Sequence, residues 1–206
     1  MKYQKFKKDI NKPFFSTQEA YIRRIPLYAS QLSLWKKQGY IGTLKRGLHY
    51  FVEYKELIIP EEISFLLYQP SYISLEWALY HYGVIPDITH AITAITTKVT
   101  RTFTNDFGHF IYRNLKPALF FGYTVETTRS RKYLLAELEK ALLDYLYLNL
   151  GQIDRADDLS ELRFNYHELA TILYPTKFQH YAALFHSKKL QHISNLILQQ
   201  CSPSLN

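Results

Sequence analysis

Histidine and cysteine side chains are the groups in this sequence whose chemistry could hold a metal ion or attack a substrate. The eight histidines are scattered along the 206 residues, and no HExxH or HxH pair occurs. His180 and His186 are six residues apart, so they do not share one face of a helix. Cys201 is the single cysteine, and it can form neither an internal disulfide nor a thiolate cage for zinc. We therefore expect ordinary surface or half-buried histidines, and a Cys201 without a nucleophilic role near the end of the chain.

Acidic and glycine-rich motifs likewise give no indication of a metal site or a catalytic site. Asp154, Asp157 and Asp158 lie close together, but the segment lacks the central glycine and terminal glutamate of a calcium-binding loop. No GxxxxGK[ST], GxGxxG or GxSxG pattern occurs, so phosphate-loop and serine-hydrolase chemistry has no support. We expect a solvated acidic loop and a protein that is not an enzyme, with no catalytic residue, no metal and no cofactor.

Positive charge is concentrated in one part of the chain. The formal net charge is +7, and residues 1–56 hold twelve Lys and Arg against four Asp and Glu, a net charge of +8. Residues 57–206 hold thirteen basic and fourteen acidic residues, a net charge of −1. A basic segment beside a nearly neutral body indicates an anionic partner for that segment, since phosphate neutralisation supplies most non-specific DNA affinity.

The elements that must position this charge have the order of a winged helix-turn-helix. Ser16 and Glu19 form a capping-box pattern that predicts a helix over residues 20–25. Pro26 predicts the first turn of a second helix, which runs to about residue 38 and ends at Gly39. Apolar and aromatic residues then flank a Lys-Arg-Gly turn, which predicts a β-hairpin over residues 40–51.

The phase of the second helix separates a core side from an outer side. At about 100° per residue, Tyr28, Leu32 and Trp35 are expected to face the core. The opposite side carries small and hydroxylated residues, which suit a helix pressed into the major groove, and the hairpin tip would reach a neighbouring phosphate or minor groove. The residues predicted to bind DNA are Arg23, Arg24, Ala29, Ser30, Ser33, Lys36, Lys37, Thr43, Lys45 and Arg46.

Residues 57–206 are predicted to form a second, α+β domain with a helical tail from about residue 151. We expect helices over 60–68 and 75–82, the latter capped by Ser74 and preceded by a break over 70–74. Strands are expected over 91–97, 101–105, 110–115, 120–126 and 132–136. A helix over 137–149 places Glu137, Lys140 and Asp144 outside its apolar stripe, and helices broken near Pro175 and Ser187 complete the chain.

Four stretches of the sequence resemble the AbiE-type antitoxins of type IV toxin–antitoxin and abortive-infection systems. Residues 70–86, PSYISLEWALYHYGVIP, are similar to the family segment PSYISLESAL…YGLIP. TTKVTR at 96–101 with GHFIYR at 108–113, and AELEKALLD at 136–144, resemble its strand and helix motifs. The basic segment from residue 32 to 48 resembles its recognition helix and wing. The motif residues of the body are Tyr72, Ser74, Glu76, Arg101, Tyr112, Arg113, Glu137, Lys140 and Asp144.

This resemblance implies a bifunctional antitoxin. The winged helix-turn-helix would bind inverted repeats in the promoter of its own operon and repress it. The body would counter a nucleotidyltransferase-like toxin, with or without a direct complex. Leu138 departs from the family, which often has proline there, and His49-Tyr50 departs from the usual end of the wing.

Two other classes of function stay open. The 18 Tyr and 13 Phe favour interfaces, so a protein-interaction module or a winged-helix regulator without antitoxin activity is the alternative. An enzyme would require His109, Arg113 or Glu137 to meet in one pocket. No apolar run approaches the roughly 20 residues of a membrane span, and no apolar stretch follows the basic N-terminus. We therefore expect a cytoplasmic protein without a signal peptide or a membrane partner.

Overall fold

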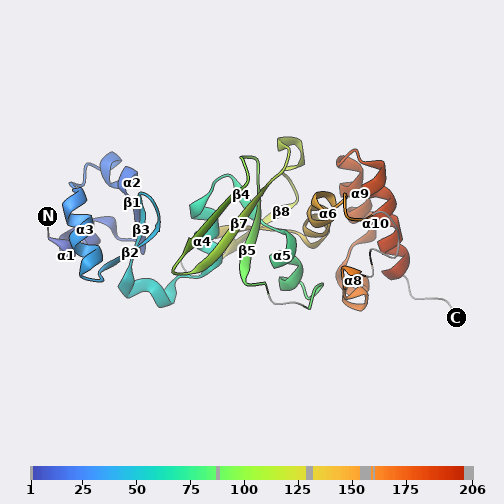
Figure 1. Ribbon diagram of the computed structural model, residues 1–206, viewed down its shortest axis with the longest axis horizontal. Helices are drawn as coiled ribbons and strands as arrows, with labels where there is room; N and C mark the ends of the chain where they lie inside the picture. Colours follow the sequence, from blue (N-terminus) through green and yellow to red (C-terminus); the bar gives the residue numbers. More distant parts are fainter. Residues whose placement is uncertain (1, 87–88, 129–131, 154–158, 160, 202–206) are drawn as a thin grey trace.

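The computed structural model describes residues 2–86, 89–128, 132–153, 159 and 161–201. Figure 1 shows an elongated molecule with three parts along its long axis. Helices and a small sheet lie at the N-terminal end, a larger sheet lies in the middle, and the last helices lie at the C-terminal end. The fold is mixed α+β, as predicted.

The N-terminal module, residues 2–56, consists of three helices on a three-stranded antiparallel sheet with strand order β1-β3-β2. The hairpin β2–β3 turns at Arg46 and Gly47, as the sequence predicts. A 3₁₀ turn (Val52–Leu57) leads out of the module. The elements of the module are α1 (Tyr3–Ile10), β1 (Phe14–Ser16), α2 (Thr17–Ile22), α3 (Ala29–Lys37), β2 (Ile41–Lys45) and β3 (Leu48–Phe51).

The helix boundaries of the module differ from prediction near Pro26. Ser16 caps α2, because its Oγ accepts a hydrogen bond from the Glu19 amide at 2.9 Å. The helix ends at Ile22, three residues earlier than predicted, because Arg24 adopts a left-handed φ of 54°. The Ile25 amide then donates to the Ala20 carbonyl at 2.9 Å, which closes the end of the helix. Pro26 lies in the connection, and α3 begins only at Ala29. Gly39 follows α3 with a φ of 71°, in agreement with the predicted cap.

The small sheet packs on both of its faces. Side chains of a strand alternate between faces, and on β3 Phe51 belongs to the core formed with the helices. Leu48 and Tyr50, on the other face, belong to the core of the rest of the protein. On β1, Phe14 likewise belongs to the core of the rest of the protein, and Phe15 belongs to the core formed with the helices. The sheet is therefore a layer between the module's own helices and the body, which we define as residues 57–201.

The body contains a six-stranded mixed sheet with the order β6-β7-β5-β4-β9-β8. β4 is a correction to the predicted break over 70–74, because it pairs antiparallel with β5 and parallel with β9 in the middle of the sheet. The predicted strand at 120–126 begins only at Tyr123. The strands are β4 (Ser71–Ile73), β5 (Ala91–Thr96), β6 (Arg101–Asn105), β7 (Gly108–Asn114), β8 (Tyr123–Thr127) and β9 (Lys132–Ala136).

The helices α4, α5 and α6 (Leu138–Leu148) contact strands of this sheet, and α6 also contacts α5, α9 and α10. Lys140 and Asp144 on α6 are fully buried, so their predicted place outside the packed stripe is wrong. The predicted breaks near Pro175 and Ser187 are confirmed, whereas Asp154, Asp157 and Asp158 lie outside the described residues. The remaining helices are α4 (Pro60–Leu67), α5 (Leu75–His81), the 3₁₀ turn η2 (Pro117–Leu119), α8 (Tyr166–Ile172), α9 (Pro175–Leu184) and α10 (Lys188–Cys201).

None of the helices in the described part of the chain is long and apolar enough to cross a membrane.

Candidate functional site

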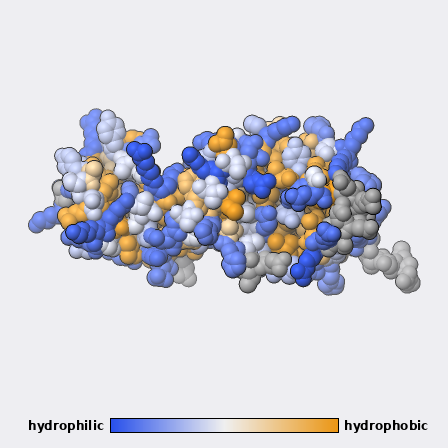
Figure 2. Space-filling view, viewed as in Figure 1, coloured by the Kyte–Doolittle hydropathy of each residue, from blue (hydrophilic) through white to orange (hydrophobic). Residues whose placement is uncertain are grey.

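The outer face of α3 is the first candidate site, and it carries small and basic side chains. Trp35 is buried in the module and Leu32 is half-buried, as predicted. Tyr28 does not face the core: it is the N-cap residue of α3 and is 62% exposed. Figure 2 shows blue hydrophilic side chains projecting from the N-terminal end of the molecule. The predicted contact residues on this helix are all exposed, namely Ala29, Ser30, Ser33, Lys36 and Lys37.

The two cations of the hairpin turn have different environments. The Arg46 side chain is exposed at the turn, as the prediction requires. Lys45 is half-buried instead, and its Nζ donates a hydrogen bond to the Leu67 carbonyl of the body at 2.5 Å. Lys36, Lys37 and Arg46 form no ion pair with any residue that the structure describes. Unpaired surface cations of this kind suit binding to phosphates.

The two arginines between α2 and α3 also have different environments. Arg23 bonds the end of α1, because its Nη1 donates to the Ile10 carbonyl at 3.2 Å and its Nη2 to the Asp9 carbonyl at 2.6 Å. Its guanidinium also lies 3.5 Å from the Glu19 carboxylate. These contacts make Arg23 a structural residue rather than a free DNA contact. Arg24 is exposed, has a φ of 54° and lines a small hollow of about 340 Å³ beside the α2–α3 connection.

Thr43 on β2 is half-buried, and its role differs from that of a surface contact. Its Oγ1 lies 3.2 Å from Nδ1 of His49 on the neighbouring strand. His49 is buried and its ring lies 5.3 Å from that of Phe15. Burial lowers the pKa of His49 to about 4, and the nearby charge of Lys36 acts in the same direction. The imidazole beneath the basic surface is therefore neutral at neutral pH.

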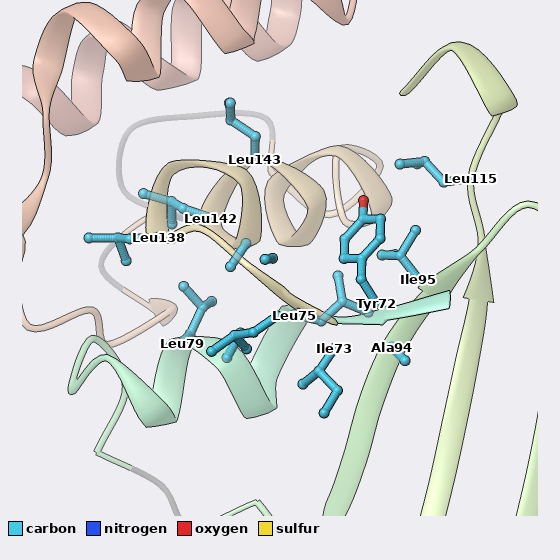
Figure 3. Packing of buried hydrophobic residues seen from close by; sticks show 14 of the residues in the cluster. Tyr72, Ile73, Leu75, Leu79, Ala94, Ile95, Leu115, Leu138, Leu142 and Leu143 are labelled. Atoms are coloured by element: carbon cyan, nitrogen blue, oxygen red, sulfur yellow. The ribbon is translucent and has the colours of Figure 1, made fainter. Parts of the chain in front are cut away.

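Four of the predicted motif residues of the body meet in one buried polar network. Figure 3 shows Tyr72 projecting from β4 toward α6. Its hydroxyl and that of Ser74 each donate to Oδ2 of Asp144 at 2.9 Å, and Lys140 Nζ lies 2.8 Å from the Tyr72 hydroxyl. Lys140 and Asp144, four residues apart on α6, also form an ion pair. The network thus connects the central strand β4 to α6.

The environment of this network is aromatic and dry. The ammonium of Lys140 lies 5.0 Å from the ring centroids of both Phe121 and Phe185 and 5.4 Å from that of Tyr72. Burial lowers the pKa of Lys140 and raises that of Asp144, while their mutual attraction opposes both shifts. Because each of the four members bonds to at least one other and has at most 1% exposed surface, the arrangement stabilises the fold and offers no group to a solute.

Glu137 belongs to a second polar cluster at the start of α6. Its carboxylate accepts a hydrogen bond from the Tyr181 hydroxyl at 2.7 Å and lies 3.0 Å from Lys177 Nζ, both on α9. Lys177 also pairs with the buried Glu139 at 3.2 Å. Although burial opposes the charge of Glu137, these two partners lower its pKa below the ordinary value. The cluster fixes the C-terminal helices to α6.

The other motif residues are distributed over separate parts of the body. Tyr112 is buried and donates to the Ser64 carbonyl at 2.6 Å. Arg101 pairs in register with Tyr112, whereas exposed Arg113 points to the opposite face of the sheet. Glu76 is half-buried, and its Oε2 is a buried atom without a hydrogen-bond partner among the described residues. The structure does not bring these four side chains together.

Other candidate chemistry has no geometric support. Within the described ranges, no group of three His, Cys, Asp or Glu side chains has the arrangement to hold a metal ion. His109 and Arg113 lie on exposed positions of β7, while Glu137 is engaged by α9, so no common pocket forms from these three. The sequence reasoning missed the partners Lys177 and Tyr181, since nothing in their local pattern indicates contact with α6.

Comparison of the chain with protein-family models and with curated proteins gives no match.

Proposed function

We propose that the protein is a cytoplasmic DNA-binding regulator whose N-terminal module is a winged helix-turn-helix, with α3 as the recognition helix and β2–β3 as the wing. The observation that carries the proposal is the outer face of α3. It is exposed, it combines Ala29, Ser30 and Ser33 with Lys36 and Lys37, and the module packs on the body through its sheet. Small side chains let a helix approach base edges closely, and the lysines neutralise phosphates.

The order of elements supports the same proposal. A helix and a short strand precede two helices separated by only six residues, and a β-hairpin follows them. The net charge of +8 over residues 1–56 is the electrostatic feature that such a module needs. We propose inverted repeats in the promoter of its own operon as the target, on the strength of the family resemblance.

Binding to promoter DNA at several salt concentrations tests this proposal. The wild-type protein is expected to bind its own upstream duplex more tightly than a scrambled duplex. Lys36→Gln with Lys37→Gln removes two phosphate-neutralising charges, so the slope of log K against log salt should decrease by about 1.8. Lys116→Gln with Lys188→Gln removes two exposed charges from the body and is the matched control. Equal affinity for both duplexes, or a slope that the α3 variant leaves unchanged, contradicts the proposal.

We further propose that the body acts as the antitoxin toward a nucleotidyltransferase-like toxin, in a direct complex or without one. The support is the resemblance of residues 70–86 and 136–144, whose motif residues Tyr72, Ser74, Lys140 and Asp144 form the β4–α6 network. Co-expression with a nucleotidyltransferase-like protein encoded beside its gene tests this role. The α3 variant should still restore growth, because the two activities are separable. Failure of the wild-type chain to restore growth contradicts the antitoxin role.

A protein-docking module is the second candidate, and exposed apolar side chains on the same module favour it. Tyr21 is 83% exposed, Ile22 69% and Leu34 52%. Large exposed apolar side chains are candidates for contact sites between proteins. Recovery of a specific protein from nuclease-treated lysate, which Ile22→Ser with Leu34→Ser abolishes, together with no DNA binding, would select this candidate.

A further inference from the structure

Three cations converge where the N-terminal module meets the body. Lys45 comes from the hairpin β2–β3, Lys98 from the β5–β6 connection and Arg101 from β6. They surround two aromatic rings: Lys98 Nζ and Arg101 Cζ lie 5.6 and 5.8 Å from the centroid of Tyr68. Arg101 Cζ and Lys45 Nζ lie 5.7 and 6.0 Å from that of Phe103. We call Lys45, Lys98 and Arg101 the seam cations.

The positive charge of the seam cations is uncompensated. None of the three forms an ion pair with a residue that the structure describes. Burial lowers the pKa of Lys45 and the charges of Lys98 and Arg101 lower it further, so these groups repel one another. Such a cluster favours a bound anion.

A shallow cleft of about 690 Å³ is lined by Lys98 and by Tyr68, the ring that Lys98 shares with Arg101, and its walls are held by hydrogen bonds. The Tyr68 hydroxyl donates to the Val99 carbonyl at 3.1 Å, and Asn114 Nδ2 donates to the Lys98 carbonyl at 2.8 Å. The Thr100 hydroxyl accepts a hydrogen bond from the backbone N–H of Asn114 at 3.2 Å. The connection that carries Lys98 is therefore ordered before a ligand arrives, which reduces the entropic cost of binding.

We propose that the seam cations form a binding site for a phosphate group, distinct from the outer face of α3. Phosphate fits because it accepts hydrogen bonds from an arginine fork and from two ammonium groups at once. Its charge would also relieve the repulsion among the three cations. The group belongs either to a free phosphorylated small molecule or to a phosphodiester of bound DNA, and both present the same chemistry to the site.

The test uses the full-length chain with two probes, inorganic pyrophosphate and the duplex described above. The site variant is Lys98→Gln with Arg101→Gln, both at exposed positions, and the control is Lys116→Gln with Lys188→Gln. If the phosphate is free, pyrophosphate raises the melting temperature of the wild-type and control proteins but not of the site variant. If it belongs to DNA, the site variant reduces the salt slope of duplex binding by about 1.8 and the control does not.

A third variant separates charge from folding. Arg101→Lys keeps the charge but loses the forked pair of donors, so it should retain part of the effect of either probe. The proposal is overturned if the site variant and the control respond alike to both probes. It is also overturned if Arg101→Lys loses as much as the site variant while its unliganded melting temperature is unchanged, because recognition by cations predicts partial retention.

Discussion

At the scale of single residues, the ion pair between Lys140 and Asp144 is the most consequential feature of the body. Both side chains have no exposed surface, so each charge depends on its partner and on Tyr72 and Ser74. A buried pair of this kind adds little net stability by itself, because the loss of hydration offsets the attraction. The free energy of unfolding should fall substantially when only one partner of the pair is removed.

Asp144→Asn should therefore destabilise the protein by about 3–5 kcal/mol, because it leaves the Lys140 ammonium buried beside aromatic rings without a counter-charge. Urea unfolding measures the change in free energy. The double variant Lys140→Met with Asp144→Leu removes both charges and should recover most of the loss. Equal stability of the single and double variants would contradict the interpretation.

His49 predicts a pH dependence that belongs to the N-terminal module. Its pKa is about 4 in the folded protein and 6.5 in its ordinary state, so the unfolded chain binds the proton more readily between these values. The stability that neutral His49 provides is fully present above pH 6.5 and is lost as the pH falls toward 4.

Thermal unfolding between pH 7.5 and 4.5 measures this effect. The melting temperature of the wild-type protein should fall more steeply with acid than that of His49→Gln, which cannot take up the proton. His192→Gln changes an exposed histidine of α10 and should follow the wild-type curve. Parallel curves for the wild type and His49→Gln would show that this imidazole does not titrate in the range.

At the scale of elements, the hairpin β2–β3 depends on one close approach. A Cβ atom on Gly42 would overlap the ring of Tyr50, which is buried and contacts Phe107 of the body. Gly42→Ala should cost about 1–3 kcal/mol of unfolding free energy through overpacking. Gly151→Ala places its Cβ in open space and is the matched control in the same chemical denaturation experiment. A loss of equal size in both variants would indicate a general effect of glycine replacement.

Local sequence signals correctly predicted the element ends that are set by a capping residue, a glycine or a proline. The cap at Ser16, the turn at Gly47 and the breaks near Pro175 and Ser187 all follow from residue types that restrict the backbone. β4 was missed, because its three residues follow Pro70 and are strand-like only through the two strands that flank them. A short strand in the middle of a sheet is defined by pairing, which a local pattern does not contain.

The polar side of α6 was misjudged for a related reason. Its periodicity correctly gave an apolar stripe, but the sheet and the later part of the chain cover its other side. Lys140 and Asp144 are buried there against Tyr72, Ser74, Phe121 and Phe185. In the candidate interface, likewise, the exposed residues of α3 follow from helical phase alone. The orientations of Lys45 and Arg23 do not follow from local sequence. Lys45 bonds the Leu67 carbonyl of the body, and Arg23 bonds the Ile10 carbonyl at the end of α1.

At the scale of the whole molecule, the contact between the N-terminal module and the body includes a charged hydrogen bond. The Tyr50 hydroxyl donates to Asp106 at 2.8 Å, and Asn105 Nδ2 donates to the Leu44 carbonyl at 3.3 Å. In a double-mutant cycle of Tyr50→Phe and Asp106→Asn, unfolding free energies should give a coupling of about 1.5–3 kcal/mol. A coupling near zero would mean that this bond does not hold the module to the body.

The two-sided packing of the small sheet has a practical consequence for anyone who divides this chain. A fragment that stops at residue 56 keeps the outer face of α3 but uncovers Phe14, Leu44, Leu48 and Tyr50, which the intact protein shields. Those side chains would form a water-exposed apolar surface on the fragment. Self-association through this surface would imitate cooperative binding to DNA. Tests of DNA binding by the outer face of α3 should for this reason use the intact chain, in which the body covers this face of the sheet.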